Sequence, residues 1–262
     1  MEGEMVRLFR SLLFYTILLF STVILGSCAM FLAYITGNGK QAHLCARLWG
    51  NINLWAAGVK VRVSGLENID PEQAYIYAAN HQGWFDIFAI LGKLPVQFRW
   101  LAKEELFKVP ILGPTMSAAG YIPIDRRDRR KAFESLSQAA LKVREGTSVV
   151  IFPEGTRSLD GILQDFKKGG FILAITAGRP IVPISISGSH RVLAKHGGWM
   201  IRPGLVGMTI GAPIPTAGYT TKDRDVLMSG VREALRKYLP QKEGGLLPDE
   251  EAARSQHIFS SM

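Results

Sequence analysis

At 262 residues the chain is long enough for one α/β domain with a full hydrophobic core, or for such a domain with a membrane anchor. Its 31 Lys and Arg against 22 Asp and Glu give a formal net charge of +9, which suits an anionic partner, and a hydrophobic content of 47% favours a membrane surface over nucleic acid. The only two cysteines, Cys28 and Cys45, form no Cys-x-x-Cys pair, which excludes a disulfide framework and gives no sign of a zinc site.

The first predicted element is a long apolar helix. No charged residue stands between Ser11 and Asn38, and a stretch of this length is enough to cross a bilayer once. Three alternatives remain open: a spanning helix, the first arm of a hairpin that enters one leaflet, and a cleaved export signal. Glu2 and Glu4 argue against the export signal, because such signals begin with a basic region. Basic residues flank the apolar stretch on both sides, so the positive-inside rule does not favour crossing and the hairpin is preferred.

The second arm of that hairpin is predicted from residue 42 to residue 59. Leu44, Leu48, Ile52 and Trp55 recur there at helical spacing with polar residues between them, as in an amphipathic helix that lies in the membrane interface. The same periodicity is equally consistent with a helix packed on a globular domain.

After Lys60 short apolar runs alternate with helical stretches, the pattern of an α/β fold. The runs are nearly continuous, which indicates a mostly parallel sheet flanked by helices on both faces. Residues 1–59 are therefore predicted to form a two-helix membrane-associated segment, residues 60–240 one α/β domain, and residues 241–262 a polar, loosely held tail. The predicted strands begin at Val61, Ala74, Gln97, Ser148, Ile181 and Val206, and the predicted helices span Trp84–Leu91, Arg129–Arg144, Lys168–Ala177 and Asp223–Tyr238.

The most informative segment runs from Asn80 to Asp86, directly after a predicted strand and into a predicted helix. Loops at strand ends are where α/β sheets hold their functional side chains. Residues five apart on a helix lie about 140° out of phase, so His81 can meet Asp86 only from the loop before the helix. A carboxylate in the first turn then fixes the imidazole tautomer and leaves the other ring nitrogen free to accept a proton. The pair has no serine or cysteine partner, which points to a general base acting on a hydroxyl; the alternative is a capping Asp and a structural His.

Three further blocks follow in order: Gly120 to Arg126, Phe152 to Ser158, and Ile181 to Ile184. Together with the Asn80 segment they resemble the four ordered blocks of the glycerolipid acyltransferases of the 1-acylglycerol-3-phosphate O-acyltransferase (lysophosphatidic acid acyltransferase) type. The resemblance covers residues 61–212, and four blocks in the right order are far more specific than any one of them.

The resemblance implies an acyltransferase catalytic domain over residues 60–240. It implies an enzyme that moves a fatty acyl chain from acyl-CoA or acyl carrier protein to the sn-2 hydroxyl of 1-acylglycerol-3-phosphate, giving phosphatidic acid. His81 would be the general base and Asp86 its orienting partner. Arginines suit a phosphate because of their fork of donors, and glycine lets backbone N–H groups approach it closely. Glu154 would either bond the acceptor's glycerol or hold Arg157 in place. By the same resemblance, the acceptor-binding residues are Lys103, Arg126, Glu154, Gly155, Thr156 and Arg157.

No metal or redox cofactor is implied, membrane lipids are the expected surroundings, and nucleic acid is not an expected partner. The expected location is a membrane, the inner membrane of a bacterium with the catalytic domain on its cytoplasmic face. A remodelling acyltransferase for another lysolipid and a non-catalytic lipid-binding protein remain as alternatives, whereas a lipase is disfavoured because the chain has no G-x-S-x-G motif. The basic run from Arg126 to Lys131 fits a solvated helix start, or docking onto anionic lipid or an acidic carrier protein. The other histidines are predicted to be structural or surface residues: His43, His190, His196 and His257.

Overall fold

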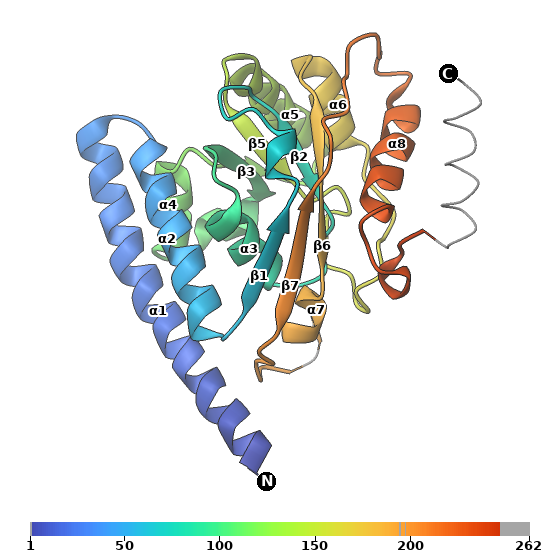
Figure 1. Cartoon of the computed structure of the whole chain (residues 1–262). Coiled ribbons are helices and arrows are strands. Elements are labelled where there is room, and N and C mark those ends of the chain that lie inside the picture. The colour runs from blue at the N-terminus through green and yellow to red at the C-terminus, as the bar shows by residue number, and fades with distance from the viewer. Residues whose placement is uncertain (1, 194, 197, 247–262) are drawn as a thin grey trace.

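The computed structural model describes residues 2–193, 195–196 and 198–246. Within them, seven strands form one sheet in the order β1-β7-β6-β2-β5-β3-β4 (Figure 1). Every neighbouring pair is parallel except β6 and β7, which confirms the mostly parallel sheet predicted from the sequence. The strands are β1 (Lys60–Ser64), β2 (Ile76–Ala79), β3 (Phe98–Lys103), β4 (Ile122–Ile124), β5 (Ser148–Ile151), β6 (Ile181–Ser187) and β7 (Leu205–Ile210).

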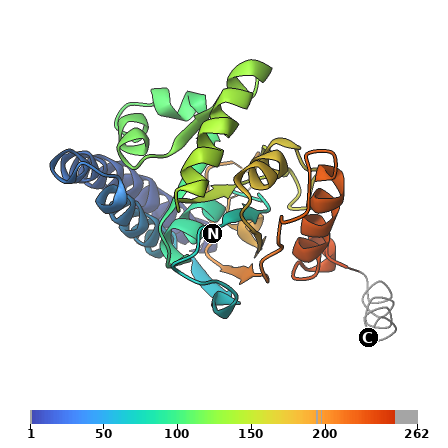
Figure 2. The same ribbon diagram turned by 90° about the horizontal axis from the view of Figure 1, so that it is seen from above.

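Helices cover both faces of the sheet, as Figure 2 shows with the N-terminal helices on the left and α8 on the right. One face packs against α1 (Glu2–Thr36), α2 (Lys40–Ala56), α3 (Phe85–Lys93) and α4 (Leu112–Ala118). The other face packs against α5 (Arg129–Arg144), α6 (Gly169–Ala177) and α8 (Arg224–Arg236). Every residue of β2 and β5 is buried, as expected for continuous apolar runs in a sheet covered on two sides.

The helices α1 and α2 lie side by side as a hairpin along one side of the domain (Figure 1). Their contact includes a hydrogen bond from Trp49 Nε1 to Thr22 Oγ1 at 3.0 Å. Further along α1, Gly26 lies so close to α4 that a Cβ placed on it would be 2.8 Å from Thr115 Oγ1. Residues 4–36 are long and apolar enough to cross a membrane, a property shared by some core helices and signal sequences, but most of this helix is not buried as a core helix would be.

Helix α2 buries polar residues and exposes apolar ones, the reverse of an amphipathic helix on a soluble domain. Its polar residues His43 and Asn53 are fully buried, His43 beside Tyr121 of the domain and Asn53 beside Ser21 of α1. Its apolar residues Leu44, Leu48 and Trp55 are exposed, Trp55 by 74%. The structure thus shows α2 packed on the globular domain with an apolar stripe facing outward, and its place in a membrane interface stays a prediction.

Among the α-helices and strands, three elements and part of the tail differ from the sequence prediction; one of them is the four-residue helix α7 (Ser189–Val192), which was not predicted. The strand β4 was not predicted, because three residues are too few to show a period. The helix α4 was also missed, since it contains Gly113 and Pro114, which rank lowest in helix propensity. The prediction of a loosely held tail is wrong for residues 241–246, because Glu243 is 1% exposed and accepts a hydrogen bond from Gln82 Nε2 at 2.9 Å. Residues 247–262, with His257, lie outside the described residues.

Candidate active site

The predicted site residues gather at one edge of the sheet. His81 follows β2, Lys103 ends β3, Arg126 follows β4 and the loop from Glu154 to Arg157 follows β5. These four strands run parallel, so their carboxyl ends meet at the same edge. Ligand and reaction sites of open α/β sheets form at this edge because the loops there come together from several strands.

His81 and Asp86 are in direct contact, with His81 Nδ1 2.8 Å from Asp86 Oδ2. As predicted, Asp86 lies in the first turn of α3 and His81 in the loop before it. Asp86 Oδ2 also accepts the backbone N–H groups of Gln82 at 2.7 Å and Gly83 at 2.8 Å, and Ser189 Oγ donates to Oδ1. Because an ionised carboxylate can only accept hydrogen bonds, the contact with Asp86 makes Nδ1 the protonated nitrogen of the neutral His81 ring. Nε2 is then a proton acceptor, and it has no hydrogen-bond partner in the described part of the chain.

The His81 ring is also fixed by aromatic stacking. It lies almost parallel to the Phe152 ring, with 3.9 Å between centroids and 10° between planes. Phe152 stacks in turn on Trp100 at 5.3 Å. The His81 side chain is 12% exposed, so the imidazole is held between a carboxylate and an aromatic face with only a small part open to solvent.

Glu154 supports the same loop from below the ring. It is 3% exposed, and its carboxylate accepts the backbone N–H of His81 at 2.6 Å and that of Gln164 at 2.9 Å. Burial raises the pKa of Glu154 to about 7; the Asp86 charge acts in the same direction, while the two N–H bonds and the Arg232 charge oppose it. The expected pairing with Arg157 is not formed in the described residues, so Glu154 holds the backbone of the histidine loop.

Two arginines meet at the loop that follows β5. Arg126 Nη1 donates to the carbonyl oxygen of Gly155. Gly155 has φ +76°, a conformation that favours glycine, and a Cβ there would be 3.3 Å from Arg126 Nη1. The guanidinium of Arg157 lies over the Trp84 ring, 4.8 Å from its centroid, and its Nη1 is buried without a hydrogen-bond partner. Burial lowers the pKa of Arg157, and the Asp86 charge opposes that effect.

The remaining predicted site residues, Lys103 and Thr156, are exposed and make few contacts. Lys103 is exposed, and its ammonium makes no hydrogen bond or ion pair with the described residues. Thr156 is exposed, and its Oγ1 accepts a hydrogen bond from Lys195 Nζ at 3.1 Å. The sequence did not single out Lys195 or Ser189, because both act on residues far away in the chain and neither stands in a local pattern.

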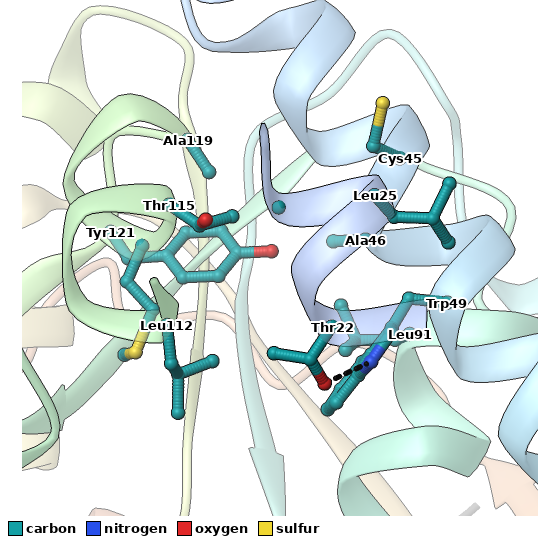
Figure 3. Close-up of a pocket in the computed structure, with 12 residues that line it drawn as sticks. Thr22, Leu25, Cys45, Ala46, Trp49, Leu91, Leu112, Thr115, Ala119 and Tyr121 are labelled. Atoms are coloured by element: carbon teal, nitrogen blue, oxygen red, sulfur yellow. Dashed lines mark hydrogen bonds between the residues drawn. The ribbon is translucent and has the colours of Figure 1, made fainter. Parts of the chain in front are cut away.

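The structure contains two notable cavities, one beside the loop after β5 and one among the N-terminal helices. An open pocket of about 500 Å³ adjoins the site, with a lining that includes Glu154, Thr156 and Lys167. A second cavity of about 60 Å³ lies between α1, α2 and α4 (Figure 3). Its lining is almost wholly apolar, and its volume is less than half of the roughly 150 Å³ of an engineered cavity that holds benzene. Of these two cavities, the first is the larger and borders the site loop at Glu154 and Thr156.

The sequence and the fold were compared with those of known proteins. The family model described as Acyltransferase matches residues 60–187. A 1-acyl-sn-glycerol-3-phosphate acyltransferase of Chlamydomonas reinhardtii is 35% identical over 76% of this chain and 61% of its own, and one of Pseudomonas aeruginosa is 31% identical over 81% of this chain and 83% of its own. A chloroplastic 1-acyl-sn-glycerol-3-phosphate acyltransferase of Brassica napus is 35% identical, and this chain spans 51% of its length.

A solved structure gives the same result at the level of the fold. The crystal structure of the 1-acyl-sn-glycerophosphate acyltransferase of Thermotoga maritima superposes with a TM-score of 0.76 and 29% sequence identity. The match covers 89% of this chain and 95% of that one.

Proposed function

The chain belongs to the Acyltransferase family, and from that premise we propose that it moves a fatty acyl chain from a thioester to the sn-2 hydroxyl of 1-acylglycerol-3-phosphate, giving phosphatidic acid. The observation that carries this proposal is the position of the His81–Asp86 pair beside the loop after β5, which carries Arg157 and accepts a hydrogen bond from Arg126. A base that activates a hydroxyl and cations that hold a phosphate are the two parts that this acceptor needs.

The reaction begins with the acceptor's hydroxyl at His81 Nε2. The acceptor's phosphate lies on Arg126 and Arg157, with Lys103 near the edge of the same site, and this fixes the glycerol beside the imidazole. His81 Nε2 takes the hydroxyl proton while Asp86, which already accepts the N–H of Nδ1, stabilises the imidazolium. Such proton transfer contributes roughly 10² to 10⁴ in rate.

The activated oxygen then attacks the thioester carbonyl carbon and forms the new C–O bond. The tetrahedral intermediate collapses with cleavage of the C–S bond, and the departing thiol sulfur receives the proton from the His81 imidazolium. Every proton and electron pair is accounted for by the two substrates and His81, so we propose no cofactor beyond the acyl-CoA or acyl carrier protein donor.

We further propose that α1 and α2 hold the site at a membrane surface. Helix α1 is packed on the domain through Phe14, beside Phe85, and Gly26, beside Thr115, so it cannot cross a bilayer without drawing the domain in with it. The exposed apolar residues of α1 and α2 suit a hairpin immersed in one leaflet. Acyl-CoA and acyl carrier protein are cytoplasmic, which in a bacterium places the domain on the cytoplasmic face of the inner membrane.

The test is a transfer assay with purified protein in lipid vesicles, radiolabelled acyl-CoA or acyl carrier protein, and a panel of lysolipid acceptors. Lysophosphatidic acid should be the preferred acceptor, and His81→Ala should lose at least a hundredfold in kcat. A remodelling enzyme would prefer another acceptor in the panel, and a non-catalytic lipid-binding protein would transfer nothing. Full activity of His81→Ala would refute the mechanism.

A further inference from the structure

Arg157 and Lys195 are two cations that are connected through the backbone of the loop after β5. Lys195 Nζ donates to Thr156 Oγ1 and to the Arg157 carbonyl oxygen, both at 3.1 Å. Arg157 lies over Trp84 with Nη1 buried and unpartnered. Neither cation forms an ion pair with any residue that the structure describes.

The one carboxylate that acts electrostatically on Arg157 is Asp86, and it has no place for a further donor. Its Oδ2 already accepts three N–H groups, and its Oδ1 accepts the hydroxyl of Ser189. A buried guanidinium nitrogen is normally hydrogen-bonded, because an unpaired one keeps the full cost of its lost hydration. The unpaired nitrogen of Arg157, on a loop whose backbone and Thr156 hydroxyl also bind Lys195, therefore points to a bound anion as the missing partner.

Lys195 and Thr156 still have donors to offer such an anion. An ammonium has three N–H bonds, and Lys195 uses two of them. Thr156 Oγ1 accepts from Lys195, so its own O–H is free to donate. Lys195 is half-buried, so an anion beside it is less screened by water than on an open surface.

We propose that Lys195 binds the acceptor's phosphate together with Arg157 and thereby favours a phosphomonoester over a phosphodiester headgroup. This inference rests on the proposed function and extends the acceptor site to a residue outside the four sequence blocks. A phosphomonoester carries about −1.5 to −2 charges at neutral pH, whereas a diester carries one. A second cation at the same phosphate therefore stabilises the monoester more than the diester.

The segment that carries Lys195 is tied to both the catalytic pair and the membrane helix. It begins at Ser189, which donates to Asp86. At its other end Ile201 N donates to Ser11 Oγ at 2.8 Å, and Tyr15 Oη donates to the Trp199 carbonyl at 2.9 Å. Residues on either side of Lys195 in the chain are therefore bonded to the catalytic pair and to α1.

The test compares Lys195→Met and Lys195→Gln with the wild-type enzyme in the vesicle assay. Lys195→Gln keeps a hydrogen-bond donor for Thr156 and Arg157 but removes the charge. Both variants should raise the KM for lysophosphatidic acid roughly ten- to hundredfold, with kcat changed less than threefold and the KM for acyl-CoA unchanged. Inhibition by glycerol 3-phosphate should weaken by the same factor, and Lys195→Arg should restore most of the affinity. Lys142→Met, an exposed residue of α5, is the control for the loss of one positive charge.

Three results would overturn the inference. An unchanged KM for lysophosphatidic acid would remove Lys195 from the acceptor site. A rise in the KM for acyl-CoA alone would assign Lys195 to the donor's phosphates. An equal loss with a lysophosphodiester acceptor, or a loss confined to Lys195→Met, would show that Lys195 only supports the loop. The proposed function fails separately, when the wild-type enzyme itself does not acylate lysophosphatidic acid.

Discussion

Replacing Asp86 by asparagine should preserve the His81 tautomer, because the amide can turn its oxygen to the ring and its NH₂ to Ser189. Asp86 Oδ2 accepts three N–H donors, so the amide oxygen of Asp86→Asn must take that position. The amide NH₂ then faces Ser189 Oγ, whose hydroxyl is free to rotate and accept. The ring therefore keeps its proton on Nδ1 and its acceptor nitrogen toward the substrate.

What Asp86→Asn loses is the charge that stabilises the imidazolium. A hydrogen bond to a charged group contributes about 1.5–3 kcal/mol and a neutral one about 0.5–1.5 kcal/mol. The loss in transition-state stabilisation is about 1 kcal/mol if a neutral hydrogen bond replaces the charged one, and up to about 3 kcal/mol if the contribution of the charged bond is lost entirely. The expected fall in kcat is roughly 5- to 150-fold. Asp86→Ala also releases the N–H groups of Gln82 and Gly83 and should lose at least tenfold more.

The measurement is kcat for lysophosphatidic acid in the vesicle assay, with unfolding midpoints to show that each variant is folded. Adding Ser189→Ala to Asp86→Asn leaves the buried NH₂ without an acceptor, which should lower the free energy of unfolding by about 1–3 kcal/mol with little further loss of kcat. If Asp86→Asn were as inactive as Asp86→Ala, the tautomer would not be fixed in this way and the reasoning would be refuted.

Three further predictions concern other parts of the molecule. Burial raises the pKa of Glu154 from 4.5 to about 7, so the folded state binds the carboxyl proton more tightly than the unfolded state, and the stability that this proton contributes is lost as pH rises. In chemical denaturation, the free energy of unfolding of the wild type relative to Glu154→Gln should fall by about 3 kcal/mol from pH 4.5 to 7. Parallel plots of unfolding free energy against pH for the two proteins would contradict this. The double variant Leu44→Glu/Leu48→Glu removes two exposed apolar side chains of α2 and should weaken binding to vesicles by about 2 kcal/mol, roughly thirtyfold in a flotation assay. The control Val226→Glu, at an exposed residue of α8, should have no effect, and equal losses in both variants would show that α2 is not on the membrane face. Gly155→Ala places a Cβ on a residue with a left-handed backbone conformation, 3.3 Å from Arg126 Nη1. It should therefore lower the free energy of unfolding by about 1–2 kcal/mol and raise the KM for lysophosphatidic acid. An unchanged KM would show that this loop does not bind the acceptor.

The parts of this fold that could be predicted from the sequence are those set by local patterns. Continuous apolar runs gave the strands of a sheet covered on both faces, and the spacing of His81 and Asp86 required one residue in a loop and the other in the first turn of a helix. The helix α2 shows where local patterns stop. Its periodicity gave a helix with an apolar and a polar face, but close packing of Gly50 and burial of His43 decide which face meets the domain.

The rest of the site depends on contacts between residues distant in the chain. Ser189 reaches Asp86 across 103 positions, and Lys195 reaches Thr156 across 39. No local period carries such information, because it arises only when the sheet brings the ends of β2, β5 and β6 together. The same limit applies to Glu154, which the resemblance assigned to the acceptor and which the fold bonds to the backbone of His81.

The hydrogen bonds of the histidine loop also restrict where the donors of the reaction lie. The backbone N–H of His81 is bonded to Glu154, and those of Gln82 and Gly83 are bonded to Asp86. These amides cannot stabilise a tetrahedral oxyanion without releasing the carboxylates that hold the base. By contrast, the backbone N–H groups of Thr156 and Arg157 have no acceptor among the described residues. Under the proposed mechanism, the backbone donors that remain for an anionic substrate or intermediate therefore include these two N–H groups, in the loop that carries Arg157.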